Sequence, residues 1–121
     1  MYSKNNLKNV ALKYVEKLEK LLAGQKFSFN VAKERIPKKR GVYVIFDKNG
    51  NAIYVGKTYK RDLCQRILKD HKSGGSQFRT ALSNKYKLSK EETSRYIIEN
   101  CSFTFKIEED PKGRSKRKSK A

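Results

Sequence analysis

The chain has 121 residues, a length that suits one domain with a modest core. Thirty Lys and Arg face twelve Asp and Glu, for a formal net charge of +18, so we expect a polyanionic partner. No apolar run is long enough to span a bilayer, and the first residues lack an apolar signal region. These features predict a cytoplasmic protein with no membrane partner. Cys64 and Cys101 are not spaced as a metal-binding pair, so we expect both to be reduced.

The N-terminal part combines an amphipathic helix with a basic arm. Apolar residues recur at helical spacing from Asn5 to Ala23, and Gly24 is a typical C-terminal stop. From Gln25 to Ile36 apolar residues alternate, which predicts either a short strand or an extended arm. A basic cluster follows, and it is either a solvated linker or a set of phosphate contacts; its members are Lys38, Lys39 and Arg40.

Two strands joined by a tight turn are expected next. Gly41 to Phe46 and Ala52 to Val55 are rich in Val, Ile and Tyr, as half-buried strands are. The turn between them contains Asn49-Gly50, and both residue types tolerate the positive φ that hairpin turns need. This segment therefore predicts a β-hairpin.

Helices dominate the second half. Asp62 can cap a helix that runs to about Lys72, and a second helix is expected from about Gln77 to Tyr86. Between them, the segment 73–76 reads Ser-Gly-Gly-Ser and predicts a flexible break. Ser89 and Glu92 form a capping box that opens a third helix, ending near Asn100.

The C-terminal part predicts a strand and then a tail. Apolar residues alternate from Ser102 to Glu108, which favours a third strand with one apolar face. The tail carries six basic residues and should be disordered. The chain thus divides into an N-terminal helix and basic arm (1–39), a central domain (40–110) and a basic tail (111–121). The expected fold class is α+β, with a small three-stranded, mainly antiparallel sheet flanked by helices.

The hairpin also carries a recognisable motif set. Gly41-Val42-Tyr43 lies in the first strand, and Tyr54-Val55-Gly56 in the second is followed by Lys57-Thr58. Arg66 and His71 follow on the expected helix. With this spacing, residues from about Arg40 to about Asp110 resemble the GIY-YIG endonuclease family. The resemblance implies the same α+β arrangement and a phosphodiester-cleaving site.

The resemblance also assigns roles. In the family one tyrosine acts as general base, the other assists, an arginine steadies the phosphate, and a histidine supports proton transfer or positioning. The residues that match are Tyr43, Tyr54, Arg66 and His71. Lys57 follows the second motif as in many members, and we expect it to bind nucleic acid with Lys38, Lys39, Arg40 and Arg61.

Two features of these residues bear on the chemistry. A tyrosine has a reference pKa of about 10, so forming phenolate at pH 7 costs roughly 4 kcal/mol, and we expect neighbouring cations to lower that cost. His71 lies five residues beyond Arg66, whereas many family members space this pair by four. Five residues turn an α-helix by about 500°, so the two side chains should share a face poorly unless the helix ends before His71.

One part of the family pattern is missing. The family holds a divalent metal ion, usually Mg²⁺, with a glutamate on a helix after the third strand, but no glutamate follows Glu109 here. The neighbouring carboxylates Glu108, Glu109 and Asp110 belong to the strand end, so the role is not transferred to them. A domain without that helix would also leave part of its sheet uncovered, which should cost stability or recruit a partner or a second copy of the chain, unless the N-terminal helix covers it.

The sequence therefore predicts a GIY-YIG-like DNA endonuclease domain that hydrolyses phosphodiester bonds with a divalent metal ion and a tyrosine general base, and whether the domain is truncated is left open. RNA is left open as a substrate. The alternative is a non-catalytic nucleic-acid-binding module that retains the fold, and the missing glutamate favours it. A third reading, attachment to the ribosome or to polyphosphate, rests on charge alone.

Overall fold

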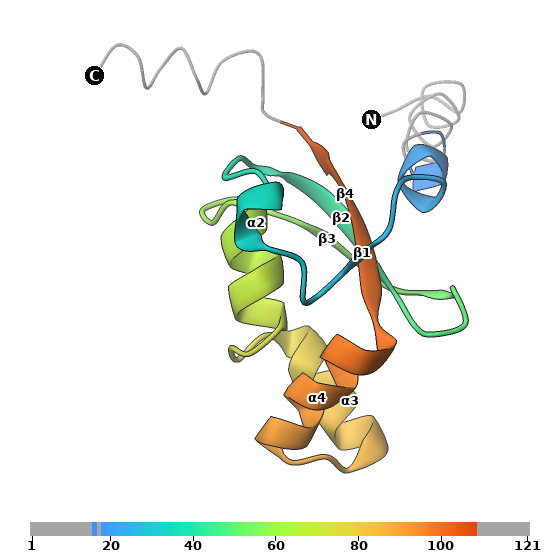
Figure 1. Cartoon of the computed structure of the whole chain (residues 1–121), viewed down its shortest axis with the longest axis vertical. Coiled ribbons are helices and arrows are strands. Elements are labelled where there is room, and N and C mark those ends of the chain that lie inside the picture. Colours follow the sequence, from blue (N-terminus) through green and yellow to red (C-terminus); the bar gives the residue numbers. More distant parts are fainter. Residues whose placement is uncertain (1–15, 17, 109–121) are drawn as a thin grey trace, which may run out of the picture.

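The structure, a computed structural model, describes residue 16 and residues 18–108 (Figure 1). Its strands are β1 (Phe27–Ser28), β2 (Gly41–Phe46), β3 (Ala52–Lys57) and β4 (Ser102–Ile107). Its helical elements after the N-terminal helix are η1 (Lys33–Arg35), α2 (Leu63–Gln65), η2 (Arg66–His71), α3 (Gln77–Tyr86) and α4 (Lys90–Asn100). The α+β fold class is confirmed.

The strands form one antiparallel sheet in the order β1-β4-β2-β3. The predicted hairpin is β2–β3, and its turn has Gly50 at φ +85°, a conformation that glycine adopts without strain. Asp47 fixes this turn, since its Oδ1 accepts hydrogen bonds from the backbone N–H groups of Asn49 and Asn51. β3 extends two residues beyond the predicted end at Val55. The two-residue β1 adds a fourth strand to the three that were expected.

The central strand β2 is buried along its whole length, on both faces of the sheet. One face carries the larger core, in which Tyr43 and Ile45 pack with side chains from β4 and the helices. The other face carries a smaller cluster; its members are Val42, Val44 and Phe46, packed against Leu18 and Leu21 of the N-terminal helix. In Figure 1 the described end of that helix lies across the sheet from α2.

The N-terminal helix therefore covers the part of the sheet formed by β2. Within the described part, residues 16 and 18–22 are helical, and the rest of the predicted helix lies outside it. The cover is incomplete, because Val55 on β3 remains 47% exposed. Whether the chain self-associates there stays a prediction. The predicted tail at 111–121 also lies outside the described residues.

The helices begin where their caps predict. Ser89 and Glu92 form the expected capping box at α4, and Asp62 forms a second one with Gln65 at α2. α3 has the predicted bounds, and Ser76 caps it by accepting a hydrogen bond from the Arg79 backbone N–H. Both cysteines are free and buried. Among the described residues, no helix is long and apolar enough to cross a membrane.

Candidate active site

The hairpin places the two motif tyrosines on the same face of the sheet. Tyr43 pairs with Gly56 across β2 and β3, and Ile45 pairs with Tyr54, so both rings point to the side of the larger core. Their ring centroids lie 6.2 Å apart. A Cβ atom on Gly56 would lie 2.3 Å from both Cζ and the hydroxyl oxygen of Tyr43. Glycine is thus required at the second motif because the Tyr43 ring lies directly over its backbone.

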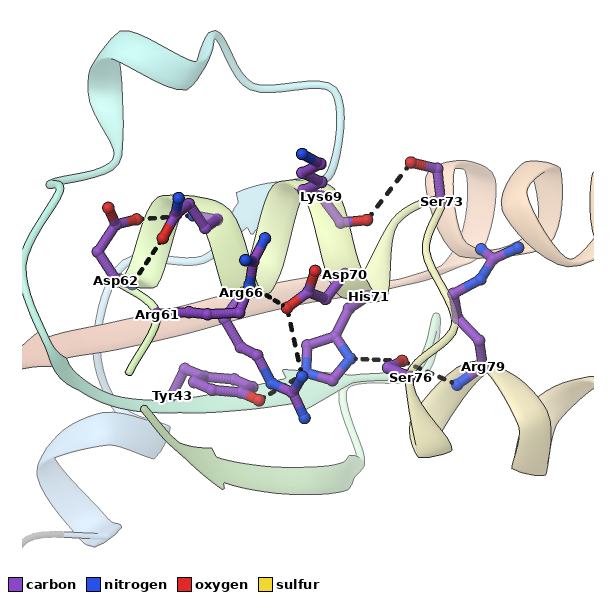
Figure 2. A network of polar contacts seen from close by, with 11 residues as sticks. Tyr43, Arg61, Asp62, Arg66, Lys69, Asp70, His71, Ser73, Ser76 and Arg79 are labelled. Atoms are coloured by element: carbon purple, nitrogen blue, oxygen red, sulfur yellow. Dashed lines mark hydrogen bonds and ion pairs between the residues drawn. The ribbon is translucent and has the colours of Figure 1, made fainter. Parts of the chain in front are cut away.

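A buried hydrogen-bonded chain starts at Tyr43. Its hydroxyl lies 2.5 Å from Nε2 of His71, and Nδ1 of His71 lies 2.8 Å from the Ser76 hydroxyl (Figure 2). Tyr43 is 1% exposed and His71 is fully buried. The Tyr54 ring packs against one side of this hydrogen-bonded series, and its centroid lies 5.2 Å from that of the His71 ring. Phe78 of α3 packs against both Tyr54 and His71. The phenol and the imidazole are therefore held in fixed contact inside an aromatic enclosure.

Arg66 joins the same site because the helix changes its winding. Residues Arg66–His71 form a π-helix, in which hydrogen bonds join residues five apart and bring them onto nearly the same face. The expectation that Arg66 and His71 would share a face poorly is therefore wrong; it assumed α-helical winding, and the helix does not end before His71 either. The Arg66 guanidinium lies beside the Tyr43 hydroxyl.

Asp70 orients the arginines at the site. Its Oδ2 lies 3.3 Å from a terminal nitrogen of Arg66, one helical turn earlier, and 2.6 Å from Nε of Arg61 as an ion pair (Figure 2). The latter contact lacks hydrogen-bond alignment despite its short distance. The carboxylate is mostly buried, with 19% of its side chain exposed. The Asp70 carboxylate therefore holds the guanidinium groups of Arg61 and Arg66 in place and neutralises part of their positive charge.

Burial controls the protonation of the central pair. Desolvation raises the pKa of Tyr43 to about 12, although Arg66 lowers it. Burial, with the positive charge of Arg66, lowers the pKa of His71 to about 4. Arg66 lowers the cost of phenolate formation as expected, but desolvation outweighs it, so the pKa of Tyr43 in the resting site lies above its ordinary value. At pH 7 a Tyr43 phenolate costs about 7 kcal/mol at 1.36 kcal/mol per pKa unit, whereas His71 is neutral and able to accept a proton.

The predicted nucleic-acid-binding residues lie around two open hollows beside this site. Lys57 and Arg61 line a hollow of about 310 Å³ together with Arg66. The basic run 38–40 lines a hollow of about 490 Å³ together with Arg61. The run is held in place by hydrogen bonds from the Leu63 backbone N–H to the Lys39 carbonyl and from the Glu108 backbone N–H to the Arg40 carbonyl. Every predicted basic residue thus borders the same surface.

The described residues do not fit the divalent metal ion that the family implies. They contain no group of three or more His, Cys, Asp or Glu side chains arranged to hold a metal ion. Near the tyrosines, Asp70 is occupied by two arginines, and both ring nitrogens of His71 have hydrogen-bond partners. A hard cation such as Mg²⁺ needs free oxygen ligands, and this donor set does not supply them.

Two residues of the site were missed from the sequence. Asp70 lies four residues after Arg66, a spacing that would indicate an ion pair on a helix. Ser76 was assigned to a flexible break, yet it is buried and links His71 to the start of α3. A serine immediately before an apolar-periodic segment is a typical N-cap, and that signal could have placed it.

Comparison with known proteins agrees with this geometry. A family model described as the GIY-YIG catalytic domain matches residues 39–117, which is more than half of the chain. No curated protein and no solved structure gave a significant match. The matched segment contains both tyrosine motifs, Arg66 and His71. The chain therefore belongs to the GIY-YIG catalytic domain family, and its fold is of the nuclease type.

Proposed function

We propose that this chain is a DNA endonuclease domain that hydrolyses phosphodiester bonds at the site formed by Tyr43, Tyr54, Arg66 and His71. The observation that carries the proposal is that these four side chains lie close together. Two strands and a π-helix bring a phenol, a guanidinium and a neutral imidazole into contact. The surrounding surface is basic, as a phosphate backbone requires.

In this proposal Arg66 and Lys57 bind the scissile phosphate, and Arg66 stabilises charge that develops on its oxygens. Tyr43 takes a proton from the attacking water as it passes its own proton to Nε2 of His71. Nδ1–H of His71 donates a hydrogen bond to the Ser76 hydroxyl. This bond fixes the tautomer in which Nε2 carries no proton and can accept one. The water oxygen bonds to phosphorus, the bond to the leaving oxygen breaks, and that oxygen takes a proton from solvent. Tyr54 packs beside His71 and keeps the proton path dry on one side.

Burial makes Tyr43 a weaker acid and His71 a weaker base, so both pKa shifts raise the cost of this relay, and the contact between the phenol and the imidazole is what supports it. A free phenolate at Tyr43 would be present in only about one molecule in 10⁵ at pH 7, given a pKa of about 12. His71, with a pKa of about 4, is neutral in nearly every molecule. A proton that moves through Tyr43 to His71 therefore does not require the phenolate to form first.

A non-catalytic nucleic-acid-binding module is the second candidate. The observation that favours it is Asp70, a carboxylate of the site, which is paired with two arginines and is not free to bind a metal ion. Such a module would keep the fold and the basic surface without the hydrolysis step.

Cleavage and binding, measured together, separate these candidates. Supercoiled and branched DNA would be incubated with the chain in Mg²⁺, in Mn²⁺ and in EDTA, and binding would be measured by fluorescence anisotropy. The nuclease proposal expects nicking by the wild type and a loss of at least 100-fold for Tyr43→Phe, with DNA affinity unchanged. Binding without nicking in any of these conditions would favour the binding module.

A further inference from the structure

An exposed tyrosine stands in the middle of the basic surface. Tyr59 lies in the loop between β3 and α2 and is 69% exposed, more than any other large apolar or aromatic side chain among the described residues. The Nζ atom of Lys57 lies 5.8 Å from the centroid of its ring. Aromatic side chains usually gain stability from burial, and the exposed Tyr59 ring does not. We therefore look to the residues around the ring for the kind of molecule that it binds.

Tyr59 lies between the two hollows and lines both. The smaller hollow is formed by residues 57–61 and Arg66. The larger is formed by the basic run 38–40, residues 59–62 and Gln65. Arg66 also lies beside the Tyr43 hydroxyl, so the smaller hollow shares one residue with the candidate active site. A strand whose phosphate is bound by Arg66 would bring an adjacent nucleotide to the Tyr59 ring.

The charge around the ring is strongly positive. Seven basic residues line the two hollows, and they are Lys38, Lys39, Arg40, Lys57, Lys60, Arg61 and Arg66. Asp62, which lines the larger hollow, caps α2, and Asp70 pairs with Arg61 and Arg66. Cations that follow a backbone, with an aromatic ring between them, are the arrangement by which proteins hold single-stranded nucleic acid.

We propose that Tyr59 is a stacking platform for an unpaired nucleobase next to the phosphate bound by Arg66, so that the domain prefers DNA with unpaired nucleotides over intact duplex. In a duplex the faces of the bases are covered by their neighbours, and Tyr59 could reach only sugar and phosphate. A gap, a single-stranded flap or a junction exposes a base face to the ring. This inference rests on the proposed function, because it assigns a substrate class to the same site.

The test compares two DNAs of equal length and charge in EDTA at one salt concentration. One is an intact duplex, and the other is a duplex with one strand unpaired over three nucleotides, one of them the fluorescent base 2-aminopurine. Tyr59→Ala should weaken binding of the second DNA about 5- to 150-fold, the range measured for base–aromatic stacking, and should abolish quenching of the fluorescent base. Binding of the duplex should change less than twofold. Tyr59→Phe keeps the ring and should behave as the wild type.

Tyr86 provides a matched control. It is 44% exposed, and Nζ of Lys85 lies 5.3 Å from its ring centroid, so it forms the same kind of lysine–tyrosine pair. It ends α3 and lines a different hollow, which contains Asp47 and no arginine. Tyr86→Ala should leave binding of both DNAs as in the wild type. Lys60→Gln should weaken the binding of both DNAs and reduce the salt dependence of both affinities.

Each possible result decides the matter. The inference is overturned if Tyr59→Ala has no effect, if it weakens both DNAs equally, or if Tyr59→Phe behaves like Tyr59→Ala. If the wild type binds both DNAs equally without quenching, this inference fails and the proposed nuclease function survives. If the wild type binds neither DNA, both fail.

Discussion

The buried histidine makes a measurable contribution to the pH dependence of stability. His71 is the chain's single histidine, and burial lowers its pKa to about 4 from an ordinary value of 6.5. Between these values the unfolded chain binds a proton that the folded chain does not, so stability falls as pH drops through this window. Linkage with these two values gives a loss of about 1.3 kcal/mol between pH 7.5 and 5.5. Above pH 6.5 the full contribution is present.

Urea unfolding at pH 7.5 and at pH 5.5, at equal ionic strength, measures this loss. The window avoids the ordinary titration range of carboxylates, tyrosines and lysines, so His71 dominates the difference. His71→Gln cannot titrate there, and its unfolding free energy should change by less than about 0.3 kcal/mol between the two conditions. The reasoning is refuted if the wild type shows the same small change as His71→Gln, since His71 would then be protonated as easily in the folded chain as in the unfolded one.

Two further substitutions test the geometry of the site. Gly56→Ala would place a methyl group against Tyr43 and should lower the unfolding free energy by about 1–3 kcal/mol. In the control Gly75→Ala, the new methyl group meets no atom within 4 Å, and the unfolding free energy should change by less than about 1 kcal/mol. Equal effects of the two variants in urea unfolding would argue against the close approach of Tyr43 to Gly56. Asp70→Asn releases Arg66 from its ion pair and should tighten DNA binding about two- to fivefold in anisotropy measurements while slowing cleavage, because the guanidinium loses its orientation. Weaker binding by that variant would show that the carboxylate is not competing with phosphate.

Local signals in the sequence were sufficient for most elements. Asn49-Gly50 between two β-rich runs predicted the hairpin, because few other residues accept the turn's positive φ. Ser89 and Glu92 predicted the start of α4 through a cap that depends only on residues three apart. The resemblance to the family brought out Tyr43 and Tyr54 as a pair, and the register of β2 with β3 accounts for their lying on one face of the sheet.

The rest depended on packing that local patterns do not encode. The π-helix that brings His71 beside Arg66 is a departure from regular α-helical winding. With α-helical winding, a spacing of five residues would place the two side chains on different faces, and that is what we expected. The raised pKa of Tyr43 follows from burial beside His71 of η2, which a count of nearby cations could not reveal. The cover of β2 by Leu18 and Leu21 likewise required knowing which face of the sheet the N-terminal helix meets.

The measurement that tests the central claim most directly is a double-mutant cycle on plasmid nicking with Tyr43→Phe, Arg66→Gln and the combined variant, each checked for folding. If these side chains act as one unit on one phosphodiester, each single change should cost at least 100-fold in rate, and the combined change should cost little more than the worse single. Costs that multiply, or a wild type that nicks no DNA, would contradict a single shared site of hydrolysis.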